Sequence, residues 1–303
     1  MIIIRMTGGM GNQMFQYALF LKLSAMGREV KFDDVSEYLG KDNARPYMLF
    51  PFGIEYPRAT ALEINMITDG SMKFSHRIRR KILGRKSLEY HEKDCNYDPL
   101  VLDRDPAYLT GYFQSEKYFR KIEEEVRRTF TFTPVIFDNL TSEMRGRVEG
   151  YEKKTDDCYS VSIHIRRGDY LESHEIYGGI CTQAYYERAV VLLREQHPEA
   201  VFFVFSNEDD FAKHWCGEAE KKHGGSFVPV LGFTEDMGYL AMYLMSKCRS
   251  HIVANSSFSW WGAYLSPHSD KMVIAPSKWF NNQDCRDIYT RDMIKITAKG
   301  EVL

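Results

Sequence analysis

The clearest candidate for anion binding in this sequence is a pair of arginines at the end of an apolar run. Arg166 and Arg167 directly follow the run 158–165. Guanidinium groups suit phosphate because they make paired, charge-assisted hydrogen bonds. Side chains diverge at the end of a strand, so we expect only one of the two arginines to face a ligand. The alternative is that Arg166 forms a salt bridge with Asp169 inside the turn.

A glycine-rich turn near the start of the chain is a second candidate. Residues 8–13 read Gly-Gly-Met-Gly-Asn-Gln and join an expected strand to an expected helix. Backbone N–H groups and the helix dipole favour anions at such a position. The turn fails as a dinucleotide fingerprint, because Met14 stands where the third glycine belongs, and it lacks the lysine of a P-loop. The alternative is a tight turn that needs positive φ.

A third strand-to-helix junction offers hydroxyl groups. Ser256 or Ser257 can cap the following helix, and the same hydroxyl and N–H groups can bind a phosphate. Phe258 can stack on a base or ribose. We expect the two tryptophans that follow, Trp260 and Trp261, to pack in the core or an interface.

Two polar segments are open to more than one interpretation. Asn207 and Glu208 follow an apolar run, where they can contact a purine or ribose edge or cap the next helix. Asp103 and Asp105 form the Asp-x-Asp pattern of some metal-dependent nucleotide-sugar enzymes, but Pro106 favours a surface turn. No His and Cys residues cluster at metal-ligand spacing.

The second half of the chain predicts the elements that position these motifs. After residue 157, nearly continuous apolar runs alternate with helical patterns, which indicates a parallel sheet covered on both faces. Ligands of such sheets bind outside the carboxyl ends of the strands. The expected strands are 158–165, 201–205, 227–231, 251–254 and 271–275, and the expected helices are 182–196, 208–222, 235–248 and 257–265.

The first half is less regular but opens with a β-α-β pattern, which is typical of parallel sheets. Its expected elements are strands 1–6, 29–32 and 108–113 and helices 12–26 and 116–130, followed by an inter-domain passage at 134–157 with its own helix at 137–151. We therefore predict two α/β domains, 1–155 and 156–303.

Composition limits the classes of protein to consider. The 303 residues include 40 Lys+Arg and 42 Asp+Glu, a net charge of −2, and 44% are hydrophobic. This balance argues against nucleic acid as a partner of the whole protein, and the composition excludes disorder. Six scattered cysteines, the lack of an 18-residue apolar run and an N-terminus too short for a signal peptide lead us to expect a cytoplasmic protein.

A basic stretch at 73–93 holds eight Lys and Arg residues against Glu89 and Glu92. Such a stretch is usually a solvated helix face. The alternative is weak peripheral contact with the anionic inner face of a membrane.

Together, four segments resemble the bacterial α-1,2-fucosyltransferases of glycosyltransferase family 11. They are residues 8–18, 111–119, 164–170 and 256–261, which follow the order of that family. The resemblance implies an α/β, GT-B-like fold of two Rossmann-like domains whose parallel sheets face a central cleft. It makes 1–155 the acceptor-side domain and 156–303 the GDP-fucose-binding domain.

The resemblance further implies an inverting transfer of fucose from GDP-β-L-fucose to the 2-OH of a galactoside, without a metal, in surface glycan synthesis such as that of O-antigen or capsule. Arg166 would bind the donor pyrophosphate. The implied donor-binding residues are Gly9, Gly11, Asn12, His164, Arg166, Asn207, Glu208, Ser256, Ser257 and Phe258. The family usually has an acidic pair where this chain has Asn207 and Glu208.

The catalytic base stays open among Asp169, Glu116 and an acid near Asp33, and we name Arg166 and Asp169 as the catalytic pair. Two other classes remain. A dinucleotide-dependent oxidoreductase would use the glycine turn and Asp33. A non-catalytic glycan-binding protein would explain the aromatic residues but not two phosphate-type motifs. The acceptor is open among lactose, N-acetyllactosamine, a type 1 chain and a lipid-linked glycan.

Overall fold

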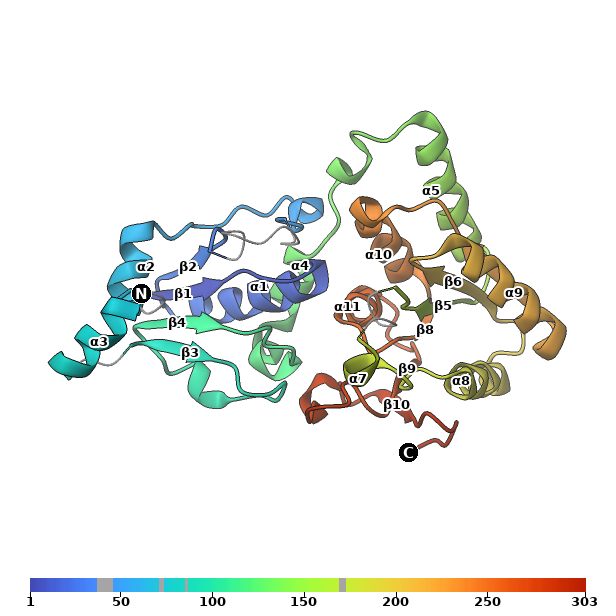
Figure 1. Cartoon of the computed structure of the whole chain (residues 1–303). Coiled ribbons are helices and arrows are strands. Elements are labelled where there is room, and N and C mark those ends of the chain that lie inside the picture. The colour runs from blue at the N-terminus through green and yellow to red at the C-terminus, as the bar shows by residue number, and fades with distance from the viewer. Residues whose placement is uncertain (37–45, 71–73, 85–86, 169–172) are drawn as a thin grey trace. The chain divides into compact units, whose positions relative to one another are not determined.

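The computed structural model describes residues 1–36, 46–70, 74–84, 87–168 and 173–303. The chain divides into two compact units, Met1–Thr131 with Arg286–Ile288 and Phe132–Cys285 with Tyr289–Leu303. Each unit is built on a sheet whose strand pairs are all parallel (Figure 1). The predicted α/β class with two parallel sheets is therefore confirmed.

The first unit contains a four-stranded sheet in the order β2-β1-β4-β3. Helix α1 covers the face that carries Phe32, where the Tyr17 ring stacks on Phe32 with a centroid distance of 5.9 Å. Helix α2 covers the other face, where Ile67 packs on Ile3. The elements are β1 Ile2–Arg5, α1 Met10–Ala25, β2 Val30–Asp33, α2 Ala61–Thr68, α3 Phe74–Leu83, β3 Glu89–His91, β4 Ala107–Thr110 and α4 Glu123–Thr129.

The second unit contains a six-stranded sheet in the order β10-β9-β8-β5-β6-β7. Its elements are α5 Ser142–Asp156, β5 Ser160–Ile165, α7 His174–Tyr177, α8 Gln183–Gln196, β6 Val201–Ser206, α9 Asp209–His223, β7 Ser226–Val230, α10 Gly238–Lys247, β8 Ser250–Ile252, α11 Ser257–Leu265, β9 Val273–Pro276 and β10 Met293–Ile296.

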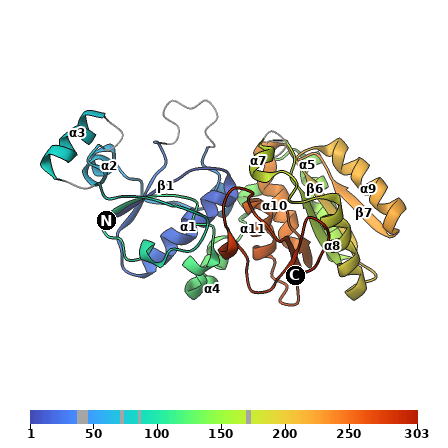
Figure 2. The same cartoon turned by 60° about the horizontal axis from the view of Figure 1, so that its bottom comes forward.

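Helices cover both faces of the second sheet (Figure 2). The side chains of β6 divide between the two faces. Phe202 and Val204 join the core beneath α8 and α9. Phe203 and Phe205 join the core beneath α5 and α10. Because successive strand residues point to opposite faces, a strand buried on both sides reads as one continuous apolar run.

The predicted domain boundary at 155/156 differs from the division into compact units, which falls at 131/132. The boundary differs because α5 packs on the second unit. This helix begins and ends five residues later than the helix expected at 137–151. Its Val148 is fully buried in the same core as Leu240 and Leu244 of α10, so the helix belongs to the second unit. The predicted roles of the two parts remain proposals.

A short segment near the C-terminus belongs to the first unit. Within Arg286–Ile288, the Asp287 carboxylate accepts hydrogen bonds from the backbone N–H of Tyr97 (3.0 Å) and from Nζ of Lys117 (2.5 Å). This segment is therefore held by the loop after β3, which contains Tyr97, and by the turn after β4, which contains Lys117. Both are far from it in the sequence.

None of the six cysteines, all of which the structure describes, forms a disulfide bond. Cys95, Cys216, Cys248 and Cys285 are buried, and Cys158 and Cys181 are partly buried. Within the described part of the chain, no helix combines the length and hydropathy needed to cross a membrane.

Candidate functional site

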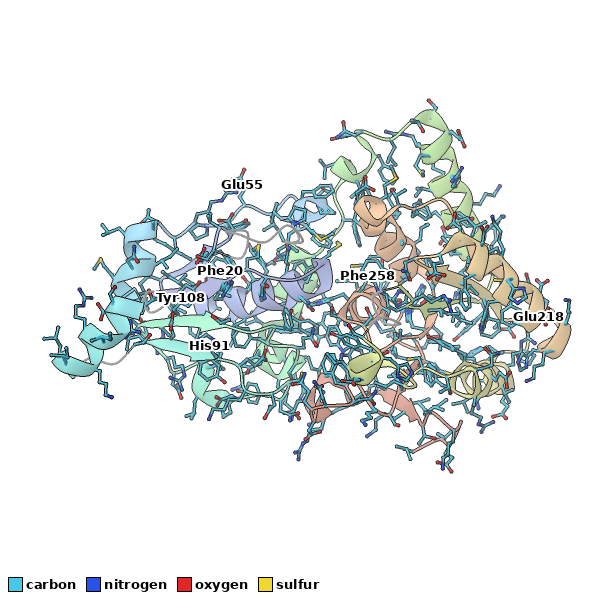
Figure 3. All side chains as sticks on the ribbon, in the orientation of Figure 1. Phe20, Glu55, His91, Tyr108, Glu218 and Phe258 are labelled. Atoms are coloured by element: carbon cyan, nitrogen blue, oxygen red, sulfur yellow. The ribbon has the colours of Figure 1, made fainter. Side chains whose placement is uncertain are left out.

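The carboxyl edge of the second sheet brings two of the predicted motifs together. From β5, the strand order continues through β6 and β7 on one side of the sheet and through β8, β9 and β10 on the other. The order therefore reverses between β5 and β8, although all the strands are parallel. Open α/β sheets bind ligands outside the carboxyl ends of the strands at this reversal. His164 near the end of β5 and Phe258 at the start of α11 meet there, with their ring centroids 5.6 Å apart. Figure 3 labels Phe258 within this unit.

His164 is buried and neutral. Burial, with a smaller effect of the Arg166 charge, lowers the pKa of His164 to about 3. The hydroxyl of Tyr186 donates to the His164 carbonyl oxygen at 2.9 Å and holds the backbone in place. Nδ1 of His164 is buried without a hydrogen-bond partner among the described residues. Such an atom is costly in a folded protein, and a polar ligand group would satisfy it.

Arg167 is held against α9. Its Nε donates to the Glu208 carboxylate at 2.9 Å, and its guanidinium lies 4.0 Å from the ring centroid of Phe211. The Asn207 side-chain oxygen accepts the Arg167 backbone N–H at 2.9 Å. Gly168 has φ +64°, and a Cβ there would lie 3.0 Å from the Asn207 amide nitrogen. Asn207 and Glu208 thus stabilise the arginine turn, and their contact with a donor stays a prediction.

The junction before α11 is anchored by Asn255, whose side-chain N–H donates to the Trp279 carbonyl at 3.0 Å. Ser256 is the N-cap residue, as predicted, but its side chain makes no capping hydrogen bond. Trp260 and Trp261 are fully buried, which confirms their place in the core. Donor binding by Ser256, Ser257 and Phe258 remains a prediction at a junction that the core holds rigidly.

The glycine turn lies at the corresponding reversal in the first sheet, between β1 and β4. Only Gly8 of its three glycines has positive φ (+77°), and a Cβ on Gly8 would lie 2.5 Å from the Asn12 amide nitrogen. A Cβ on Gly9 would meet nothing within 4 Å, and Gly11 lies inside α1. A tight turn therefore accounts for Gly8 alone, while the space beside Gly9 is open.

Two glutamines join this turn to the loop after β4. That loop belongs to one of the four segments that carry the family resemblance, but the sequence predicted no function for either glutamine. Gln114 donates from Nε2 to the Asn12 side-chain oxygen at 2.6 Å. Gln16 donates to the Gly111 carbonyl at 2.9 Å and accepts the Thr7 N–H at 3.1 Å. The Oε1 atom of Gln114 is buried without a partner among the described residues. The turn and the loop therefore form one polar cluster at this edge.

Glu92 supports the same loop, and sequence reasoning missed it. It follows β3, and its carboxylate accepts the backbone N–H groups of Tyr112 (2.7 Å) and Phe113 (3.0 Å). Phe113 has φ +54°, which is unusual for a residue other than glycine. Burial raises the pKa of Glu92 to about 7, although the two N–H bonds lower it. The carboxylate thus holds a strained turn next to Gln114.

We expect Glu92 to make stability depend on pH. Its pKa in the folded protein, about 7, lies above the ordinary 4.5, so the folded state keeps this proton where the unfolded chain has lost it. The free energy of unfolding should therefore fall as the pH rises from about 4.5 to about 7, by at most about 1.4 kcal/mol per pH unit. Glu92→Gln should remove this slope when urea unfolding is measured across that range.

Glu124→Gln, at an exposed position of α4, is the matched control and should keep the wild-type slope. If Glu92→Gln retained the full slope, the pH dependence would belong to another group.

The candidate bases have different environments. Asp169 lies outside the described residues. The Glu116 carboxylate accepts a hydrogen bond from Nε of Arg120 at 3.1 Å. Asp33 is 1% exposed; its Oδ1 accepts the N–H groups of Val35 (3.1 Å) and Ser36 (2.9 Å).

The other oxygen of Asp33 is also engaged, because it accepts the Tyr108 hydroxyl at 2.7 Å. Burial raises the pKa of Asp33, but its hydrogen bonds with Ser36, Tyr108 and Val35 outweigh that effect and lower it below the ordinary value. The first sheet thus uses Asp33 as a structural carboxylate that ties β2 to β4.

The Asp-x-Asp pattern does not form a metal site in the described part of the chain. Asp105 pairs with Arg28 at 3.3 Å. Across the residues that the structure describes, no group of three or more His, Cys, Asp or Glu side chains is placed to hold a metal ion.

These features define a class: two-unit α/β proteins with polar side chains at the strand reversal of each parallel sheet. The family model of glycosyl transferase family 11 matches residues 90–297. The chain therefore belongs to glycosyltransferase family 11, and the resemblance found in its motifs is confirmed.

The similar proteins agree with this assignment. Over 287 residues the chain is 29% identical to an α-1,2-colitosyltransferase of Escherichia coli, with 93% of each chain covered. Over 298 residues it is 29% identical to the O-antigen biosynthesis glycosyltransferase WbnK of Escherichia coli, covering 91% of this chain and 93% of that one. A solved structure of an Arabidopsis thaliana FUT1 mutant in complex with GDP is similar in fold, with a TM-score of 0.51 and 13% identity, covering 92% of this chain and 71% of that one.

Proposed function

We propose that this protein is an inverting galactoside α-1,2-fucosyltransferase, which moves L-fucose from GDP-β-L-fucose to the 2-OH of a galactose-containing glycan. The observation that carries the proposal is the strand reversal between β5 and β8, where Arg166 follows a neutral His164 with an unsatisfied ring nitrogen. Family membership and the α-1,2 linkage in the name of one relative support the reaction.

In this proposal the second unit binds the donor. Arg166 lies at the carboxyl end of β5, where its guanidinium can bind the pyrophosphate with paired hydrogen bonds. Nδ1 of His164 is available to a polar group of the nucleoside, and Phe258 offers a ring beside it. The GDP held by the solved structure of similar fold supports a guanosine diphosphate donor.

The chemistry requires stabilisation of a leaving diphosphate. Breaking the fucosyl–oxygen bond puts negative charge on GDP and gives an oxocarbenium-like sugar. Fixed cations and N–H donors aimed at the leaving group can supply this stabilisation, so we propose a reaction without a metal. Single displacement by the acceptor hydroxyl gives inversion, and that hydroxyl loses its proton to a base, for which we retain Asp169.

The first unit binds the acceptor in this proposal, where Oε1 of Gln114 is without a partner among the described residues and can accept a sugar hydroxyl. Gly9, Gly11 and Asn12 keep their predicted contact with the donor. The open space beside Gly9 lets a ligand approach the backbone there. The similar O-antigen glycosyltransferase supports a surface glycan as the destination.

The oxidoreductase alternative receives no support from Asp33. In that class the acid after the second strand binds the ribose hydroxyls of the cofactor. Here both oxygens of Asp33 are engaged by the N–H groups of Val35 and Ser36 and by Tyr108. A glycan-binding protein without activity would not explain a buried, unsatisfied histidine beside an arginine.

GDP is expected to stabilise the protein without added metal. At about 100 times its Kd, a ligand that binds only the folded state adds about 2.7 kcal/mol, which raises Tm by several degrees. We would measure Tm with GDP in the presence of EDTA, with NAD and with free sugars. A response to NAD without one to GDP would overturn the proposal.

Product analysis tests the reaction itself. Incubation with GDP-fucose and a galactoside array should give a product whose NMR spectrum shows an α-anomeric fucose on O2 of galactose. A colitosyl donor belongs in the same experiment because of the similar colitosyltransferase. Preference for that donor would change the donor sugar and leave the reaction class intact, whereas linkage to another hydroxyl would contradict the proposal.

A further inference from the structure

Exposed apolar side chains lie on both α2 and α3 of the first unit. Leu62 and Met66 on α2 are 70% and 71% exposed, and Ile78 and Ile82 on α3 are 47% and 78% exposed. Leu83, the last residue of α3, is 57% exposed. Both pairs are spaced four residues apart, so each helix places its pair on one side.

Contacts on the other sides of the two helices hold these residues outward. Helix α2 attaches to the sheet through Ile67, which packs on Ile3 and Tyr108. Helix α3 attaches to the end of α2 through Arg80, which donates to the Asp69 carbonyl at 2.9 Å.

Arg79 of α3 adds to this attachment by pairing with the Asp69 carboxylate. These contacts leave the apolar pairs exposed on the surface of the unit.

Basic residues outnumber acidic ones in the sequence that contains α3. Lys81 is exposed on α3, and the whole stretch 73–93 has eight basic residues against two acidic ones. At 100° per residue, Lys81 borders the side of α3 that carries Ile78 and Ile82, whereas Arg79 on the other border pairs with Asp69. Apolar residues bordered by Lys and Arg are typical of helices that lie in a membrane interface, whereas Lys is depleted from protein–protein interfaces.

We propose that the α2–α3 surface, defined by Leu62, Met66, Ile78, Lys81, Ile82 and Leu83, binds the surface of an anionic lipid bilayer. The apolar side chains enter the acyl boundary, and Lys81 contacts anionic headgroups. Figure 1 places α2 and α3 at the end of this unit opposite the carboxyl edge of its sheet. Lipid contact there leaves the cluster of Asn12 and Gln114 accessible, and the inference goes beyond the proposed reaction.

Flotation with lipid vesicles tests the proposal. The wild-type protein should float with vesicles of equal parts phosphatidylcholine and phosphatidylglycerol, less so at high salt, and stay unbound with phosphatidylcholine alone. Ile78→Ser combined with Ile82→Ser should lower the partition coefficient roughly tenfold or more, because it removes apolar area. Lys81→Glu should also lower it.

Two matched controls distinguish binding by this surface from nonspecific adsorption of the protein to vesicles. Leu100→Ser removes an apolar residue that is 60% exposed elsewhere in the first unit, and Lys121→Glu reverses an exposed charge. Both should float as the wild type does. All changed positions are exposed, and unchanged Tm values would confirm folding.

The proposal is overturned if the wild type does not float with anionic vesicles, or if the double serine variant floats equally well. It is also overturned if light scattering shows a dimer that the double serine variant converts to a monomer, since a second copy of the chain would then cover this surface.

Discussion

Arg166→Ala is expected to lower kcat/KM with GDP-fucose by about 100- to 1,000-fold, the scale of about 2.7–4 kcal/mol for the loss of one group that stabilises developing negative charge. Arg166 follows the central strand β5 at the point where the strand order reverses, next to the buried His164. In the proposed reaction its guanidinium stabilises the diphosphate as the sugar bond breaks. Initial-rate kinetics, with Tm as a check on folding, would measure the effect.

Two further variants sharpen this test. Arg166→Lys keeps the positive charge but loses the planar guanidinium that can make paired hydrogen bonds. We therefore expect its kcat/KM to lie between that of the wild type and that of the alanine variant. Arg167→Ala removes the pair with Glu208 and the contact with Phe211, so we expect mainly a lower Tm. Near-normal turnover of Arg166→Ala, or a larger catalytic loss in Arg167→Ala, would contradict the role of Arg166.

Trp261→Ala is expected to lower the free energy of unfolding by about 3–5 kcal/mol, as for other buried aromatic residues. Trp261 is fully buried in α11, with its ring centroid 5.0 Å from Trp260 and 5.1 Å from Tyr264. Deleting the indole leaves a cavity that this aromatic cluster cannot fill. Denaturant unfolding followed by fluorescence and circular dichroism would measure the change.

The control is Val191→Ala, which changes a residue 37% exposed on α8 and should cost less than about 1 kcal/mol. Trp261→Phe should recover much of the lost stability and bind GDP as the wild type does. If Trp261→Phe were as stable as the wild type but had lost GDP binding, the side chain would be a ligand contact rather than a core residue.

The second unit could be predicted closely because its strands are long and buried on both faces. All six residues of β5 are buried, and β6 is almost as apolar, so the runs at 158–165 and 201–205 match the observed strands within two residues. Parallel strands then place Arg166 and Ser256 at one edge without further information. The exception is the use of Asn207 and Glu208, since only the folded turn shows that both bind Arg167.

The first unit could be predicted less well because tertiary contacts decide its local structure. The helix expected at 116–130 is instead two short 3₁₀ turns followed by α4. Tyr118, the last residue of the first turn, and Phe119, which follows it, are nearly fully buried. Tyr118 packs against Phe113 and Phe119 against Phe15. A regular amphipathic helix would not bury these two adjacent rings in the same way.

Glu92 could not be found from the sequence because its function depends on the pairing of β3 with β4. Strand β3 has only three residues, too few to show a periodic pattern. The available signal was Gly111: a Cβ at that position would lie 2.5 Å from the Cβ of Glu92. A glycine directly after a strand indicates such a close approach only once the neighbouring strand is known.

The return of Arg286–Ile288 to the first unit has a consequence for protein engineering. Consider a chimera in which only residues 1–131 are replaced by those of another family member. The residues at positions 97 and 117 would then come from the relative, whereas their partner Asp287 would come from this chain. A fragment ending at residue 131 would likewise leave the Tyr97 N–H without this acceptor. Exchanging the whole first unit between relatives therefore requires moving two separate segments together, 1–131 and 286–288.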